Sequence, residues 1–190
     1  MKKSKIQKTL NKLLGPEFLS VRQGFGCVKL TYVEGWAVIG LANKIFGYNG
    51  WNSTIKEITQ EYLEVSKDNK VSVGYSSLCR ITLSDGTYKE DVGFGSSDNL
   101  KSKGMAIEKA KKEAVTDSLK RALRQFGNLL GNCCYNKSYL KYVSKLEKKK
   151  NLSTLKEENI VRSLNEIDLS ETEDENAICS LNIEDLETQN

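Results

Sequence analysis

The sequence contains no histidine among its 190 residues. Histidine is the commonest general base in enzymes and a frequent zinc ligand, so histidine-based triads and the common zinc sites are excluded. The five cysteines do not replace it, because their number is odd and they form no Cys-x-x-Cys pair. This pattern argues against a disulfide framework and indicates reduced thiols in an intracellular protein.

Long hydrophobic runs are missing as well. The sequence has no stretch of about 18 apolar residues, which a membrane-spanning helix would need. The basic N-terminus, residues 1–18, lacks the continuous apolar segment of a signal peptide. By these tests we expect a protein that is neither secreted nor held in a membrane.

Motifs for metal and nucleotide chemistry are also scarce. Glu90 and Asp91 are adjacent, but neighbouring residues of a strand point to opposite faces, so this pair would not converge on one metal ion. The glycine-rich segment 93–104 lies between a predicted strand and a predicted helix, as a phosphate-binding loop would. It nevertheless has neither the Gly-Lys-Ser/Thr of a Walker motif nor a Gly-x-Gly-x-x-Gly pattern. We therefore expect no metal-dependent nuclease activity, no ATP binding and no cofactor.

Charge is distributed very unevenly along the chain. Residues 1–156 carry 28 Lys and Arg against 14 Asp and Glu, whereas residues 157–190 carry one Arg against 11 acidic residues. Residues 151–190 are also polar and poor in aromatic side chains, which is typical of disorder. We expect a basic domain over residues 1–150 with a polyanionic partner, nucleic acid being the leading candidate, and an acidic tail over residues 151–190.

Hydrophobic periodicity predicts an α+β fold. Helical spacing appears over residues 6–14, 36–46 and 102–126, and a strand is predicted within residues 25–35. Residues 53–94 alternate between apolar and polar side chains and contain turn signals at 68–70 and 84–86, which predicts an antiparallel meander of at least three strands. The long helix at 102–126 must then cover one face of the meander.

The long predicted helix carries an unusual set of charges. Helix electrostatics offer one explanation, because cations favour the last turn and Asp117 can pair with Arg121 at i,i+4. Asp117 and Glu113 are too few to neutralise every cation, however, and the basic charge of the domain favours phosphate binding. The cations opposite the apolar arc are Lys109, Lys120, Arg121 and Arg124. Aromatic residues that we consider as stacking partners for bases are Tyr32, Phe46, Tyr48 and Trp51.

Several segments closely resemble the N-terminal annealing domain of the Rad52 family. They are LGPEFLSVR, ANKIFGYNGW, DGTYKEDVGFG, LKSKGMAIEKAKKEAVTDSLKRALRQFGN and LGNCC, and the likeness covers residues 7–143. The resemblance implies a β-β-β-α core that forms homo-oligomeric rings, binds single-stranded DNA in a basic groove and anneals complementary strands without a cofactor. It implies a nuclear protein of homologous recombination and double-strand break repair that is not an enzyme.

The resemblance also implies two sets of DNA-binding residues. The primary groove would consist of Arg22, Tyr32, Lys120, Arg121 and Arg124. A second, shallower site would consist of Lys70, Lys101, Lys137 and Lys141. Because basic residues occupy all four positions of the second set, we expect two strand-binding sites.

The acidic tail departs from the family pattern. Full-size members carry a long C-terminal half that binds the single-strand-coating protein and the strand-exchange recombinase, and we do not expect recombinase binding here. The chain resembles a short, annealing-only member or a paralogue of the Rad fifty-nine type, and its tail is expected to contact the single-strand-coating protein. Two alternatives stay open: a double-stranded RNA-binding module, which shares the β-β-β-α order, and an accessory or scaffold ring subunit.

Overall fold

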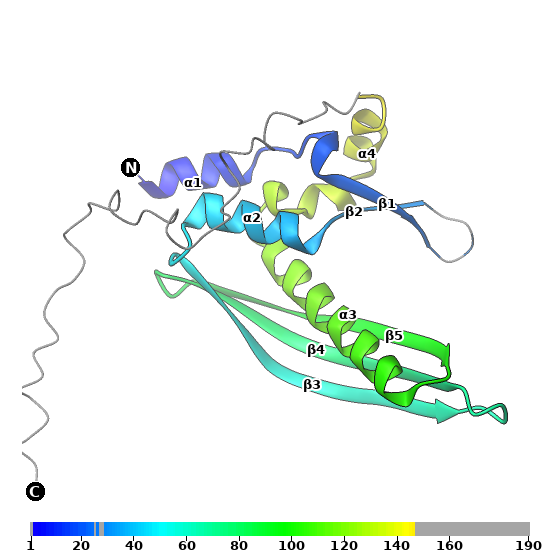
Figure 1. Ribbon diagram of the computed structural model, residues 1–190. Helices are drawn as coiled ribbons and strands as arrows, with labels where there is room; N and C mark the ends of the chain where they lie inside the picture. Colours follow the sequence, from blue (N-terminus) through cyan, green and yellow to red (C-terminus); the bar gives the residue numbers. More distant parts are fainter. Residues whose placement is uncertain (1, 25, 27–28, 147–190) are drawn as a thin grey trace, which may run out of the picture. The chain divides into compact units, whose positions relative to one another are not determined.

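The computed structural model describes residues 2–24, 26 and 29–146 (Figure 1). These belong to one compact unit, residues 1–149, and the predicted acidic tail at 151–190 lies outside the described residues. The elements in order are α1 (Lys2–Leu10), η1 (Pro16–Phe18), β1 (Leu19–Gln23), β2 (Lys29–Val33), α2 (Gly35–Phe46), β3 (Trp51–Val65), β4 (Val71–Leu83), β5 (Tyr88–Leu100), α3 (Lys103–Arg124), η3 (Asn128–Leu130), η4 (Asn132–Tyr135) and α4 (Lys137–Val143).

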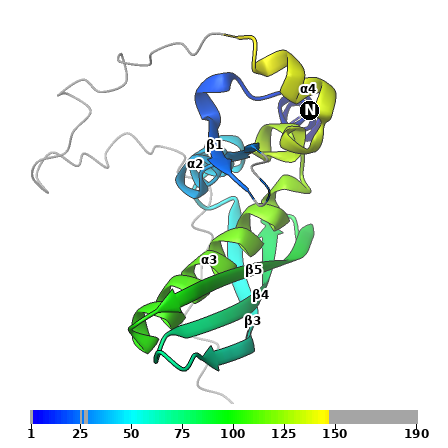
Figure 2. The ribbon, with the colours of Figure 1, turned by 90° about the vertical axis from the view of Figure 1, so that its right-hand side faces the viewer.

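The sheet confirms the predicted α+β class. β3, β4 and β5 form an antiparallel sheet in the order β3-β4-β5, and α3 lies along one face of it, mainly against β4 and β5 (Figures 1 and 2). The alternation predicted for β4 is present, because Val73, Cys79 and Ile81 are fully buried beneath the helix. The predicted turns at 68–70 and 84–86 join the strands, and Ser102 caps α3 by accepting a hydrogen bond from Met105 N.

Glycine lets α3 approach β5 unusually closely. A Cβ on Gly93 would lie 2.1 Å from Ser118 N, and one on Gly95 would lie 2.3 Å from Ala110 O. The interpretation of residues 93–104 as a loop between a strand and a helix is wrong over most of this segment, because β5 continues to Leu100. Beyond Phe94 the strand has no apolar side chain until Leu100, so the sequence shows no alternation there.

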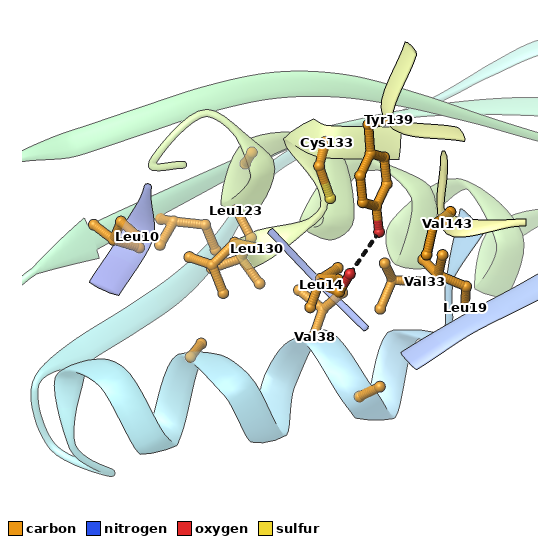
Figure 3. Packing of buried hydrophobic residues seen from close by; sticks show 14 of the residues in the cluster. Leu10, Leu14, Leu19, Val33, Val38, Leu123, Leu130, Cys133, Tyr139 and Val143 are labelled. Carbon is orange, nitrogen blue, oxygen red and sulfur yellow. Dashed lines mark hydrogen bonds between the residues drawn. The ribbon is translucent and has the colours of Figure 1, made fainter. Parts of the chain in front are cut away.

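The C-terminal part of α3 belongs to a second layer of packing. Leu123 and Leu130 pack with Val38 of α2, with α1 and with α4 in one buried cluster (Figure 3). The predicted first helix ends earlier than expected, at Leu10, but Leu14 remains buried and its carbonyl accepts a hydrogen bond from the Tyr139 hydroxyl at 2.9 Å. This cluster fixes the N-terminal segments and α4 to the end of α3.

A two-stranded hairpin lies beside this end of α3. The strand predicted within residues 25–35 is β2, and it pairs antiparallel with β1, which sequence analysis did not predict. Within residues 2–24, 26 and 29–146, no helix is long and apolar enough to cross a membrane. The same residues contain no group of three His, Cys, Asp or Glu side chains arranged to hold a metal ion.

Candidate nucleic-acid interface

A groove of about 550 Å³ lies between the β1–β2 hairpin, the C-terminal half of α3 and the segment 130–140. Arg22 of β1 and Tyr32 of β2 line the groove on one side, and the basic C-terminal turns of α3 line it on the other. All residues predicted for the primary site line it: Arg22, Tyr32, Lys120, Arg121 and Arg124. Lys29 adds a further cation. The fold thus brings together groups that are about 100 residues apart in the chain.

A second hollow of about 380 Å³ continues the groove toward the N-terminus of α3. The two hollows share Arg22, Asp117 and Lys120, and the second one adds Lys112 and Phe94. From Lys112 to Lys120 the helix rises by about 12 Å. Cations therefore follow the helix for more than two turns, as a track for an extended polyanion requires.

Tyr32 lies between two cations of the groove. Arg22 Cζ is 5.6 Å and Lys120 Nζ is 5.2 Å from the centre of its ring, within the range of cation–π attraction. Its hydroxyl donates a hydrogen bond of 2.8 Å to Glu34 Oε1, which is the main cause of a raised pKa of Tyr32. The phenol therefore stays neutral at physiological pH, with its ring held by both flanking cations.

Asp91 of β5 anchors two of the arginines. Arg121 Nε donates to Asp91 Oδ1 at 3.1 Å, and Arg124 Nη2 lies 3.6 Å from Asp91 Oδ2. Gln125 Nε2 also donates to Asp91 Oδ2, at 3.1 Å. Partial burial lowers the pKa of Arg121, but the hydrogen bond and charge of Asp91, together with smaller contributions that include the charge of Asp117, more than offset this, so the pKa is raised. The contacts with Asp91 thus hold both guanidinium groups in position at the groove.

Asp91 is a carboxylate partner for Arg121 and Arg124 in addition to Asp117 and Glu113, which sequence spacing indicates are too few for all the helix cations. The partner comes from the sheet and not from the helix, so helical spacing gave no sign of it. Of the three carboxylates of α3, Glu108 pairs with Lys112 at 2.6 Å, and the other two bind the sheet backbone. Asp117 accepts from Phe94 N at 3.3 Å and Glu113 from Ser96 N at 3.4 Å, so they cover the outer edge of β5. As predicted, Glu90 faces away from Asp91 and pairs with Arg80 Nε at 2.6 Å.

Replacing Asp91 by alanine is expected to lower the free energy of unfolding by about 2 kcal/mol, because a largely buried acceptor for two guanidinium groups is lost. Urea unfolding followed by circular dichroism measures this. The matched control is Glu90→Ala, which removes the neighbouring carboxylate and a more exposed ion pair on the other face, with an expected cost of less than about 1 kcal/mol. Equal losses in the two variants would show that Asp91 has no special anchoring role.

Of the proposed stacking residues, only Tyr32 lines the groove. Phe46 packs edge-to-face on Phe126 at 5.8 Å, and Trp51 Nε1 donates to Asn43 Oδ1 at 2.8 Å, so both contribute to packing near α2. Tyr48 is 84% exposed in the turn after α2 but does not line the groove. Tyr135, which no sequence pattern indicated, does line it.

Cys134 is a second groove residue that sequence analysis did not single out. It lies beside Cys133, whose side chain is buried in the core at the end of α3. A hydrogen bond with Cys133, together with burial, raises the pKa of the Cys134 thiol. Cys134 therefore remains a neutral thiol and adds no charge to the groove.

The residues predicted for a second site form two separate pairs within one chain. Lys70 precedes β4 and Lys101 follows β5, and they are neighbours because Val71 pairs with Leu100. The other pair, Lys137 and Lys141, lies one turn apart on α4, beyond the opposite end of α3 (Figure 1). A helix of 22 residues, about 33 Å long, separates the two pairs. The second site remains a prediction.

The fold and groove define an α+β domain in which a long helix on an antiparallel sheet carries a basic, aromatic-lined track. In comparisons with known proteins, residues 2–153 match the Rad52/22 family double-strand break repair protein. The chain therefore belongs to the Rad52/22 family.

Several relatives are similar over the same part of the chain. DNA repair and recombination protein RAD52 of Saccharomyces cerevisiae is 50% identical over 142 residues, which cover 75% of this chain and 30% of that protein. DNA repair and recombination protein rad22 of Schizosaccharomyces pombe is 50% identical over 143 residues, with coverages of 75% and 30%. The protein rti1 of the same yeast is 50% identical over 142 residues, with coverages of 75% and 38%. The chain thus spans about a third of the length of these relatives.

Proposed function

We propose that the groove binds single-stranded DNA and promotes the annealing of complementary strands, without ATP, in homologous recombination and double-strand break repair in the nucleus. The observation that carries the proposal is the convergence of cations from two strands and one helix on one groove: Arg22, Lys29, Lys120, Arg121 and Arg124. Membership of a family of double-strand break repair proteins, and relatives named for DNA repair and recombination, support it.

The proposed mechanism follows from where the charges lie. Contacts to phosphates fix the position and extension of a strand but do not read its sequence, so the base edges stay free. The cations also reduce the repulsion between the bound backbone and that of an incoming strand. Base pairing then supplies the free energy of annealing. No covalent bond is made or broken, so we propose a binding and annealing factor and not an enzyme.

Affinity for single-stranded DNA is expected to fall steeply with salt. With five cations on phosphates, the logarithm of the association constant should fall with the logarithm of salt concentration with a slope of about −3.5. Fluorescence anisotropy of labelled oligothymidine over a series of salt concentrations measures it. An affinity that does not change with salt concentration would contradict the proposal. If duplex RNA displaced the labelled oligothymidine completely and single-stranded DNA of another sequence did not, the result would favour a different polyanion as the ligand.

Assembly is part of the proposal. We propose that copies of the chain associate into rings, which light scattering after size-exclusion chromatography measures. A pure monomer at micromolar concentration would contradict this.

We also propose that residues 151–190 contact the single-strand-coating protein, because 11 of the acidic residues lie beyond residue 156. A pull-down comparing the full chain with residues 1–150 tests the contact. Equal capture of both would remove the proposal. An accessory role beside a larger annealing protein is the alternative, and an active protein in the absence of any relative would exclude it.

A further inference from the structure

Tyr135 is an exposed aromatic ring at the end of the basic groove. It is the last residue of η4 and lines the groove beside Arg124, yet 63% of the residue remains accessible to solvent. Leu130 and Tyr139, large residues on either side of it in the sequence, are buried in the adjoining core. A ring left exposed among phosphate-binding cations therefore calls for a separate explanation.

The surroundings of Tyr135 fix the orientation of its ring. Arg124 Cζ lies 4.2 Å from the ring centre, a close cation–π contact, and Arg124 is itself held by Asp91 on β5. Arg124 thus contacts the ring and, through Asp91, links it to the sheet. The large exposed area of the ring is left to receive another flat group.

The ring differs in this respect from Tyr32, the other aromatic residue of the groove. Tyr32 contacts Arg22 and Lys120, and its hydroxyl is bonded to Glu34. It is more enclosed than Tyr135, since part of the residue is buried under its neighbours. Of the two rings, Tyr135 therefore offers the more accessible surface next to a phosphate ligand.

We propose that Tyr135 is a stacking platform for an unpaired nucleobase of the bound strand. This inference rests on the proposed function, and adds a contact to a base where the cations contact only phosphates. Every base has a flat π-face, so stacking on Tyr135 tolerates any sequence. Arg124 would bind the phosphate and the adjoining ring of Tyr135 would stack on the base. One nucleotide is then contacted at both its phosphate and its base.

Stacking can be separated from a purely structural role by using a strand without bases. The two probes are oligothymidine and an abasic oligonucleotide of the same length, which keeps the phosphates but has nothing to stack. Tyr135→Leu removes the ring and keeps an apolar side chain, and Tyr135→Phe keeps the ring. The matched control is Tyr142→Leu, because Tyr142 on α4 is equally exposed, at 64%, and does not line the groove.

Tyr135→Leu is expected to weaken oligothymidine binding by about 10-fold, within the range that stacking of one base gives, and to leave abasic binding unchanged. Tyr135→Phe and Tyr142→Leu should bind both probes like the wild type. An equal loss for both probes would overturn the inference, because Tyr135 would then only position Arg124. Unchanged oligothymidine binding in Tyr135→Leu would overturn it too.

The outcomes also separate this inference from the proposed function. If the wild-type protein binds neither probe, the proposed function fails at its first step. If it binds both probes with the expected dependence on salt and Tyr135→Leu behaves like the wild type, only the stacking role fails. Circular dichroism and the unfolding midpoint establish that each variant is folded before its affinity is compared.

Discussion

Replacing Lys120, Arg121 and Arg124 together by alanine is expected to weaken binding of single-stranded DNA about 100-fold at 0.1 M salt, and to abolish annealing at protein concentrations that suffice for the wild type. With three fewer phosphate contacts, fewer counterions are released from the DNA on binding. The slope of the logarithm of the association constant against the logarithm of salt concentration should therefore become less steep by about 2. Anisotropy titrations give both quantities, and strand annealing is followed with two labelled complementary oligonucleotides without ATP.

Two controls make this result interpretable. Lys5→Ala/Lys8→Ala/Lys12→Ala removes the same number of charges from exposed positions on or just after α1, outside the groove, and should change affinity only slightly. The groove variant also leaves Asp91 without its arginines, so a fourth change, Asp91→Asn, removes that uncompensated charge. If the quadruple variant regains annealing, the arginines serve folding. If it stays inactive while folded, they are phosphate ligands.

Part of this groove could be predicted because its charges lie on a regular element. The spacing of α3 places Lys120, Arg121 and Arg124 away from the apolar arc, but it selects Lys109 in the same way, and Lys109 does not line the groove. Arg22 came only from the resemblance to a family, and Tyr32 was one of four aromatic candidates until the resemblance singled it out. β1, the strand that carries Arg22, buries little besides Leu19, so it has no readable alternation.

Asp91 and Tyr135 could not be predicted for a different reason. Asp91 contacts Arg121 across 30 residues of sequence, and only the packing of α3 on β5 brings the two together. That packing depends in turn on glycines, which in the sequence resemble a loop. Tyr135 lies in a single turn of 3-10 helix, too short for any periodicity to show which way its ring points. Local patterns predicted most of the helices and the strands of the main sheet, whereas the contacts between elements required the structure.

The close contact of α3 with β5 determines how the whole groove is positioned. Small residues recur along the buried stripe of the helix at Ala106, Ala110, Ala114 and Ser118, and all are fully buried. Gly93 and Gly95 face this stripe from β5. Because Asp91 lies on the same strand two residues before Gly93, any increase in the distance between β5 and α3 also separates Asp91 from Arg121 and Arg124.

Gly93→Ala is therefore expected to destabilise the domain by more than about 3 kcal/mol, a large share of the roughly 5–15 kcal/mol typical of a folded domain. The new Cβ would lie 2.1 Å from Ser118 N and 2.6 Å from Ala114 O, and these are backbone atoms that no side-chain rotation can move away. The helix must shift outward, opening space around the alanines and weakening the hydrogen bond from Phe94 N to Asp117.

The matched control for Gly93→Ala is Gly40→Ala on α2, where the added Cβ would meet no atom within 4 Å. Alanine there should stabilise the protein by up to about 1 kcal/mol, because glycine is the poorer helix former. Urea unfolding of both variants gives opposite signs for the same chemical change. A Gly93→Ala protein as stable as the wild type would mean that helix and sheet have freedom to separate, and the arginines of the groove could then not depend on Asp91 for their position.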